Sequence, residues 1–237
     1  MDLNSKPKTR NTKLPFVFAN FAMTADGKIA FANHMFVPFG SRRDQKHMME
    51  LRATADAVMS GARTVDLSPA TLGTGGTKYQ RLRLKRGLSE YNLRVIVSGS
   101  GSVDPKAEIF KRKFSPIIIL TTRRASERRL KKLRELADVK ICGQSEINFA
   151  AAFRWLRKKW GVKRLLCEGG GELNGALFHA GLVDELHLTL CPKIFGGRRA
   201  PTIADGQGFT HLATAARFKL KSAQRVGNEL FLVFRRV

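Results

Sequence analysis

The chain has 237 residues, of which 43% are hydrophobic, and this length and composition are typical of one α/β domain with a substantial core. No apolar run approaches the roughly 20 residues of a membrane span, and the basic stretch 1–14 lacks the apolar part of a secretory signal. We therefore expect a disordered tail at 1–14, no membrane partner and a cytoplasmic location. The net charge of +24 exceeds what a small-molecule site needs, so we expect most of it on the surface, where it serves solubility or attracts nucleic acid weakly and without sequence specificity.

Short β-rich runs alternate with helical periods, and no linker or repeat interrupts them, so we expect residues 15–237 to form a single α/β domain. Gly227-Asn228 predicts a hairpin turn between the last two strands, which makes the sheet mixed. The predicted strands are Phe16–Ala22, Ala57–Ser60, Arg94–Ser98, Ile117–Thr121, Val139–Cys142, Arg164–Glu168, Glu185–Cys191, Ala215–Arg225 and Glu229–Arg235. The predicted helices are Arg42–Ala53, Ser126–Ala137, Phe149–Lys159 and Glu172–Ala180.

Polar residues accompany the first strand and the helix after it. Lys28, in Asp26-Gly27-Lys28, is either a surface residue of a turn or a charge that holds an anionic ligand or supplies a proton. Arg52 ends the predicted helix, where its charge suits the helix dipole and its planar guanidinium could equally clamp a phosphate. Thr64 is either a helix cap or a hydroxyl that contacts a ligand.

Three small turns follow later. Residues 73–78, Gly-Thr-Gly-Gly-Thr-Lys, lack the order of a phosphate loop, and we expect a flexible surface loop there. Ser98-Gly99 is a small turn at which a cofactor could approach closely. Thr121 and Arg123, at the end of an apolar strand, could bind the 2′-phosphate that distinguishes NADPH from NADH, and a basic surface loop is an equal alternative.

The segment 163–197 is the most informative part of the chain. An apolar strand ends in Glu168 and three glycines, Gly169 to Gly171, and a helix and a further strand follow. Glycines at this position allow close approach of a ligand, and a helix N-terminus favours phosphate, so the pattern predicts a nucleotide site at the end of the strand. The alternative is a tight strand-to-helix turn in which Glu168 is only a solvated or helix-end charge.

Other classes of site find little support in the sequence. Three widely spaced cysteines in apolar segments predict neither disulfides nor zinc, and the five histidines show no metal-ligand spacing, so we expect no metal site. The His-x-Glu and Pro-Cys-x-x-Cys motifs of zinc deaminases are absent from the sequence, as is a Gly-x-Ser-x-Gly nucleophile motif. Hydride transfer suits this inventory because the cofactor carries the chemistry.

Three blocks in the same order resemble a known family. They are FAMTADGKIA at 21–30, Leu-Arg-Ala with ADAVMSGART at 51–64, and Glu-Gly-Gly-Gly at 168–171 followed by AGLVDEL and Pro192 to Gly197. Together they resemble the reductase domain of the bacterial riboflavin-biosynthesis deaminase/reductase, from about residue 15 to the C-terminus. The resemblance implies a single three-layer dihydrofolate-reductase-like domain with a mostly parallel sheet and a C-terminal antiparallel hairpin, in a stand-alone form without the deaminase, which commonly forms a homodimer.

The resemblance also implies an activity and its residues. It implies NADPH-dependent reduction of the ribose of 5-amino-6-(5-phosphoribosylamino)uracil to the ribityl form. Lys28, Arg52 and Glu168 would bind the substrate, with Glu168 and Lys28 as catalytic groups. The resemblance would place the cofactor at Ala30, Thr64 and the turn and helix made of Gly170, Gly171, Glu172, Leu173, Asn174, Gly175 and Ala176. To these we add Ser98, Gly99, Thr121 and Arg123 as cofactor-binding candidates because they follow the ends of strands. Glu168→Gln is then expected to abolish turnover while the fold survives.

The chain departs from the family pattern after Thr64. Asp66 is only a displaced candidate for the family's aspartate, and the next substrate arginine has no counterpart in the loop at 73–78. An alternative is therefore a reductase of the same fold that acts on another pyrimidine, pterin or carbonyl compound. A second alternative, of another class, is a basic nucleic-acid-binding protein that has kept the fold without the activity.

Overall fold

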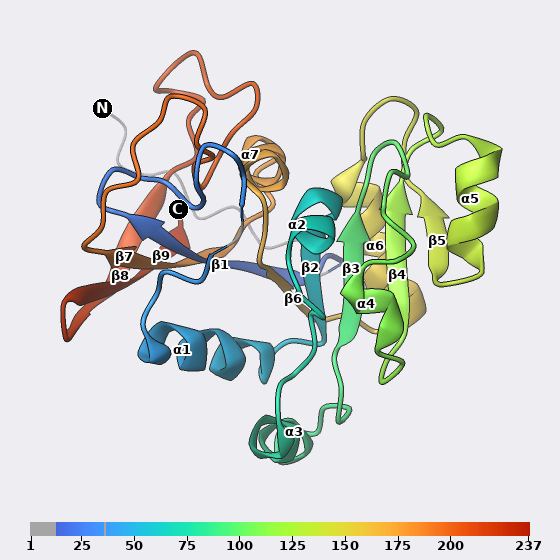
Figure 1. The fold of residues 1–237 in the computed structure, drawn as a ribbon, viewed down its shortest axis with the longest axis horizontal. Helices are drawn as coiled ribbons and strands as arrows, with labels where there is room; N and C mark the ends of the chain where they lie inside the picture. The colour runs from blue at the N-terminus through green and yellow to red at the C-terminus, as the bar shows by residue number, and fades with distance from the viewer. Residues whose placement is uncertain (1–12, 36) are drawn as a thin grey trace.

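The computed structural model describes residues 13–35 and 37–237, which build one nine-stranded sheet in the order β5-β4-β3-β2-β6-β1-β7-β9-β8. Figure 1 shows β5 at one edge and the hairpin of β8 and β9 at the other. The strands from β5 to β7 are parallel, whereas β9 is antiparallel to both β7 and β8. The strands are β1 (Phe16–Thr24), β2 (Ala57–Gly61), β3 (Leu93–Val97), β4 (Ile117–Thr121), β5 (Asp138–Ile141), β6 (Arg164–Cys167), β7 (Glu185–Cys191), β8 (Phe218–Val226) and β9 (Glu229–Arg236).

Helices cover both faces of the sheet, which gives the three layers that the resemblance implied (Figure 1). One face packs against α6 and α7 through Phe153 and Leu177, and the other against α1 and α2 through Leu51 and Val65. Alternate residues of β1, β2, β3, β4 and β6 belong to the two cores, as the period of two requires. The helices within the described residues are α1 (Arg42–Arg52), α2 (Ala62–Leu67), α3 (Thr77–Leu84), α4 (Glu108–Lys111), α5 (Glu127–Arg134), α6 (Phe149–Trp160) and α7 (Gly171–His179).

The predicted strands and the four predicted helices are confirmed, with boundaries that differ by three residues or fewer. The hairpin turn is confirmed as well, since Val226 pairs with Glu229 across Gly227, which has a φ of +61°. The helices α2, α3 and α4 were not predicted. The two shortest have six and four residues, and a helix of that length carries too few positions for a periodic pattern.

Two expectations about the surface need correction. Arg83 is buried, although we expected most of the cations on the surface, and Arg94 in β3 is buried as well. Their guanidinium groups donate hydrogen bonds to backbone carbonyls, among them Ser89 O for Arg83 and Ile109 O for Arg94. The loop at 73–78 is also only partly a surface loop, because Thr74 is buried and its hydroxyl donates to Asn92 Oδ1 at 2.8 Å.

The described residues include no helix that is long and apolar enough to cross a membrane. Most of the tail expected at 1–14, namely residues 1–12, lies outside the described residues. Leu14, at its end, packs against the core beneath α6 and α7.

Candidate functional site

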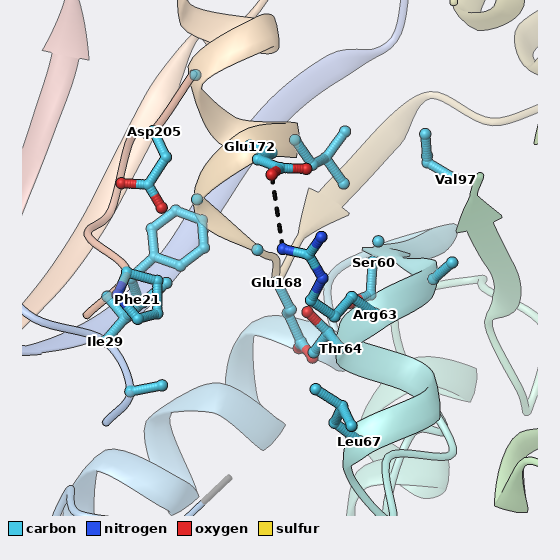
Figure 2. A pocket seen from close by; sticks show the side chains of 18 of the residues that line it. Phe21, Ile29, Ser60, Arg63, Thr64, Leu67, Val97, Glu168, Glu172 and Asp205 are labelled. Atoms are coloured by element: carbon cyan, nitrogen blue, oxygen red, sulfur yellow. Dashed lines mark ion pairs between the residues drawn. The ribbon is translucent and has the colours of Figure 1, made fainter. Parts of the chain in front are cut away.

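A cavity of about 2050 Å³ lies where several parallel strands end. Its lining includes residues from the carboxyl halves of β1, β2 and β3, the turn after β6, and the faces of α1, α2 and α7 (Figure 2). The carboxyl ends of parallel strands meet at one edge of a sheet, which is where open α/β proteins bind their ligands. The cavity is large enough for a dinucleotide and a second small molecule together.

Glu168 and Arg52 form a buried ion pair in this cavity. The Arg52 Nε donates to Glu168 Oε1 at 2.7 Å, and Nη2 donates to Oε2 at 2.5 Å, so the pair is bidentate. Both side chains are only 8% exposed. The third contact of the guanidinium is Nη1 to the Gly73 carbonyl at 2.8 Å. Arg52 is therefore the partner that fixes Glu168, and three of its donors are already used within the protein.

The glycines after Glu168 meet two different needs. Gly169 and Gly170 have φ of +143° and +93°, a region that side chains avoid, and a Cβ on Gly170 would lie 3.3 Å from the Thr64 hydroxyl. A Cβ on Gly171 would lie 2.1 Å from the Asp205 carboxylate, so this glycine admits a neighbouring loop. At Gly170 the backbone beside Thr64 is therefore free of a side chain. At Gly171 the missing side chain lets the loop around Asp205 pack directly against α7.

The N-terminus of α7 opens on the cavity without a side-chain cap. Its first turn carries Glu172, which pairs with Arg63 of α2 at 3.5 Å, as the dashed line in Figure 2 marks. Both side chains are largely exposed, so the pair contributes little to stability and an anion could replace Glu172 as the partner of Arg63. Free backbone N–H groups, the positive end of the helix dipole and a nearby guanidinium suit a phosphate.

The structure brings most of the predicted site residues together. Those that line the cavity are Ala30, Arg52, Thr64, Ser98, Gly99, Glu168, Gly170, Gly171, Glu172, Leu173, Gly175 and Ala176. Asn174 is buried below them, where its amide nitrogen donates to the Ile203 carbonyl at 2.8 Å. The Lys28 ammonium donates to the Ala200 carbonyl at 3.2 Å, and Ala200 is part of the cavity wall, so Lys28 supports that wall from outside.

The predicted 2′-phosphate cluster has a buried and an exposed part. Thr121 and Thr122 are fully buried, and the Thr122 hydroxyl donates to the Gly99 carbonyl at 2.6 Å. These threonines thus fix the Ser98-Gly99 turn, which lines the cavity, and do not line it themselves. Arg123 is exposed, and its backbone N–H is held by the Gly143 carbonyl at 3.0 Å.

Two carboxyl groups that line the cavity have raised pKa values. Burial raises the pKa of Asp44, in the first turn of α1; a hydrogen bond from Thr189 opposes the rise and the nearby Glu229 adds to it. Burial also raises the pKa of Asp66, although the Asp104 N–H donates to its carboxylate at 3.0 Å. Asp66, the displaced candidate, thus lines the cavity, whereas Asp44 was missed because it resembles an ordinary first-turn acid.

Sequence reasoning also missed Asn20 and Ser60, which line the cavity from β1 and β2. The sequence held a signal for Asn20, since a lone amide interrupts the apolar run of the first strand. Ser60 carried no such signal, because serine is common at the end of a strand.

An open, mostly parallel α/β sheet with a ligand-sized cavity, a bare glycine turn and an uncapped helix N-terminus is an arrangement at which α/β proteins bind phosphate-containing ligands. Residues 15–232 match the model of the RibD C-terminal domain, and the chain belongs to that family. Two relatives are named 2,5-diamino-6-ribosylamino-4(3H)-pyrimidinone 5′-phosphate reductase. The one from Archaeoglobus fulgidus is 30% identical over 213 residues, 90% of this chain and 94% of the relative. The one from Methanothermobacter thermautotrophicus is 31% identical over 220 residues, 93% and 97% of the two chains.

Solved structures confirm the dihydrofolate-reductase-like fold. A pyrimidine reductase-like protein from Corynebacterium diphtheriae superposes with a TM-score of 0.77 at 24% identity, over 94% of this chain and 92% of that one. RibD of Acinetobacter baumannii gives a TM-score of 0.76 at 20% identity over 95% of this chain. This chain spans 59% of the length of that RibD structure.

Proposed function

We propose that the protein is an NADPH-dependent reductase that acts on a phosphorylated ribosylaminopyrimidine in riboflavin biosynthesis. The observation that carries the proposal is the buried carboxylate of Glu168, held by Arg52 at the end of β6 beside a bare glycine turn. Such a group is needed to orient a polar substrate against a dinucleotide, and folding alone gives no reason to place it in a cavity. The near full-length similarity to two reductases of this class supports the same proposal.

The names of those relatives favour one of two candidate substrates. The sequence resemblance implied the uracil derivative, whereas the relatives are named for the 2,5-diamino pyrimidinone, which carries an amino group at position 2 in place of the oxo group. We propose the diamino compound as the substrate and keep the uracil compound as the second candidate. RibD proteins, which are longer, match at 25% to 29% identity over 55% to 58% of their length.

The described residues fit the dinucleotide. The bare backbone at Gly170, the uncapped N-terminus of α7 and the exposed Arg63 would hold its phosphates, and the Ser98-Gly99 turn would contact its far end. When bound, NADPH supplies the hydride that reduces C1′ of the ribosylamino group. The protein supplies position, charge and exclusion of water.

Glu168 acts in this proposal as an acceptor that orients the substrate. Each of its oxygens already accepts one bond from Arg52 and keeps capacity for one more, so the carboxylate can accept an N–H or O–H of the substrate. The catalytic role expected for Lys28 stays a prediction, because its ammonium contacts the cavity wall from outside.

Replacement of Glu168 tests the proposal. Glu168→Gln removes the acceptor and is expected to lower turnover of the diamino substrate by about a hundredfold or more in single-turnover assays with NADPH. It also leaves the Arg52 charge buried without its partner, so we expect a loss of about 3–5 kcal/mol in stability, contrary to the sequence-based expectation of an intact fold.

A double variant separates catalysis from folding. Arg52→Met combined with Glu168→Gln removes both charges and is expected to recover part of the lost stability and NADPH binding without recovering turnover. Recovery of hydride transfer in the double variant, or a normal rate in Glu168→Gln, would assign Glu168 to folding. Failure of the unmodified protein to reduce either pyrimidine would reject the proposed function itself.

The preference for NADPH over NADH is a separate prediction. The exposed guanidinium of Arg123 follows the buried threonines that fix the Ser98-Gly99 turn, so it is anchored close to one end of the cavity. A charge-assisted bond to the 2′-phosphate is expected to make NADPH bind more tightly, and Arg123→Ala to narrow the difference. Fluorescence titration measures both affinities, with Arg81→Ala as a control at an exposed arginine outside the cavity. Equal affinities in the unmodified protein would contradict the prediction.

We further propose a homodimer in a reducing compartment such as the cytoplasm. Cys142, Cys167 and Cys191 are free and buried, which supports a protein that does not depend on disulfides. Size-exclusion chromatography with light scattering tests the dimer.

A further inference from the structure

Three polar residues lie side by side across neighbouring strands at the bottom of the cavity. Cys167 of β6 pairs with Ala19 of β1 and with Met59 of β2, so the next residue of each strand continues the same row. These residues are Asn20, Glu168 and Ser60, which we call the polar row. All three line the cavity, and Figure 2 shows Glu168 and Ser60 there. The backbone pairing extends beyond the strands, since the Glu168 N–H donates to the Met59 carbonyl at 2.9 Å.

Two atoms of the polar row have no hydrogen-bond partner among the described residues. These atoms are Asn20 Oδ1 and Ser60 Oγ. Residue Asn20 is 8% exposed and residue Ser60 is 0% exposed. A buried polar atom without a partner destabilises a fold, so a group in this state within a cavity is more readily explained by a ligand than by folding. Glu168, between them, has its position fixed by Arg52 and keeps free acceptor capacity.

We infer that the polar row is the subsite for the aminopyrimidine base of the substrate, and that Asn20 selects its 2-amino group. This inference rests on the proposed function and adds the residues that determine its specificity. An amide oxygen and a carboxylate accept hydrogen bonds, and a hydroxyl accepts or donates, so the row presents acceptors spaced roughly 4.8 Å apart along the strands' ends. An aminopyrimidine presents N–H donors along its edges and complements such a row.

The 2-position distinguishes the two candidate substrates. An amino group there donates to Asn20 Oδ1 as the amide stands in the structure, whereas an oxo group requires the amide to turn and present Nδ2 in place of Oδ1. A site that holds a buried acceptor for a substrate N–H discriminates strongly against an analogue that lacks the donor, because the acceptor then stays unpaired. The unmodified protein is therefore expected to show a kcat/KM at least tenfold higher for the diamino pyrimidinone than for the uracil compound.

The test uses Asn20→Leu and Ser60→Ala with both pyrimidines and NADPH. Asn20→Leu is expected to raise KM for the diamino substrate at least tenfold and to remove the preference over the uracil compound. Ser60→Ala is expected to raise KM for both compounds. NADPH affinity is expected to stay unchanged in both variants, and the melting temperature without substrate to stay level or rise, since each change removes an unpartnered buried atom. A purely structural role would lower the melting temperature.

Two controls make the result decisive. Trp160→Phe removes another buried atom without a partner, Trp160 Nε1, from a residue that does not line the cavity, and is expected to leave KM unchanged. Asn20→Ala serves if the leucine does not fit, with the same expected loss of preference. Turnover and preference that both variants leave unchanged would overturn the subsite alone. Absence of turnover on both pyrimidines by the unmodified protein would overturn the proposed function and the subsite with it.

Discussion

Arg83 shows how a buried cation supports the site from a distance. Its guanidinium lies under the end of α1 and donates to the carbonyls of Arg52, Ala55 and Ser89. Burial lowers its pKa from the usual value for arginine. The Arg52 carbonyl at the end of the helix also accepts from the Ala55 N–H at 3.2 Å, so Arg83 adds a second donor there. In this way Arg83 holds the backbone from which Arg52 reaches Glu168.

Removal of this guanidinium is expected to be costly. Arg83→Met keeps much of the side-chain volume but removes the guanidinium donor of the Ala55 and Ser89 carbonyls and one of two donors of the Arg52 carbonyl, so we expect a loss of about 2–4 kcal/mol in the free energy of unfolding, measured by urea denaturation. Arg81→Met, on an exposed position of the same helix, is the matched control and is expected to change stability by less than about 0.5 kcal/mol. If Arg83→Met changed the free energy of unfolding as little as Arg81→Met, the hydrogen bonds of Arg83 would not contribute to stability.

At the scale of residues, the sequence predicted Glu168 better than its partner. A strand, a charged residue and three glycines in succession are a local pattern, and the structure places that carboxylate in the cavity. The bond to Arg52 joins residues 116 positions apart, so no local pattern indicates it. Buried Arg83 was unpredictable for a similar reason, because it lies among exposed cations and its acceptors belong to other elements.

At the scale of elements, α7 depends on a loop that sequence reasoning did not associate with it. The backbone N–H of Asp205 donates to the Gly171 carbonyl at 2.9 Å, and Asn174 donates to the Ile203 carbonyl. A Cβ on Gly175 would lie 1.9 Å from the Asp205 carbonyl oxygen, closer than atoms approach. The glycine at 175 is thus required by the contact between the helix and this loop.

The sign of the change in stability caused by Gly175→Ala tests this contact. In a helix free of neighbours, alanine would stabilise by about 1 kcal/mol relative to glycine. Against the Asp205 carbonyl it is expected instead to destabilise by about 1–3 kcal/mol, because backbone must move. Thermal unfolding measures the change, and Gly76→Ser, at a helix start with open space and a φ of −74°, is the control expected to be neutral or stabilising. An increase in stability on Gly175→Ala would show that the loop around Asp205 can move away from α7 at little cost.

The elements themselves were largely predictable because their signals are local. The apolar run Ile117–Thr121 indicates a strand, and the periodic pattern at Phe149–Trp160 indicates a helix, each from a few neighbouring residues. The cap residues Ser126 and Asn148 carry a local signal too, since each accepts a backbone N–H of its own helix. The short helix α2 lacks a side-chain cap and begins directly after β2, so its formation depends on packing that the sequence alone does not express.

At the scale of the molecule, the order of βα units and the final hairpin determine the sheet, and both are visible in the sequence. The cavity is less predictable, because its lining joins residues from position 20 to position 208 that only the folded sheet brings together. The same holds for Asn20 and Ser60, whose shared row depends on strand register.

The charge of +24 concerns the whole surface and leads to the last prediction. Exposed cations occur on separate elements, for example Lys113 before β4 and Lys132 on α5. Scattered charges bind nucleic acid through phosphates, without reading bases. We therefore expect weak binding of RNA and DNA that is independent of sequence and falls by about a thousandfold or more between 50 and 200 mM salt.

Fluorescence anisotropy with several unrelated oligonucleotides measures this binding across salt concentrations. Lys113→Gln and Lys132→Gln are expected to weaken it by similar small factors, because each removes one phosphate contact among many. A dedicated site would respond to one change and not the other. Selective binding of one sequence at physiological salt would favour the alternative of a nucleic-acid-binding protein, since base contacts survive salt that phosphate contacts do not.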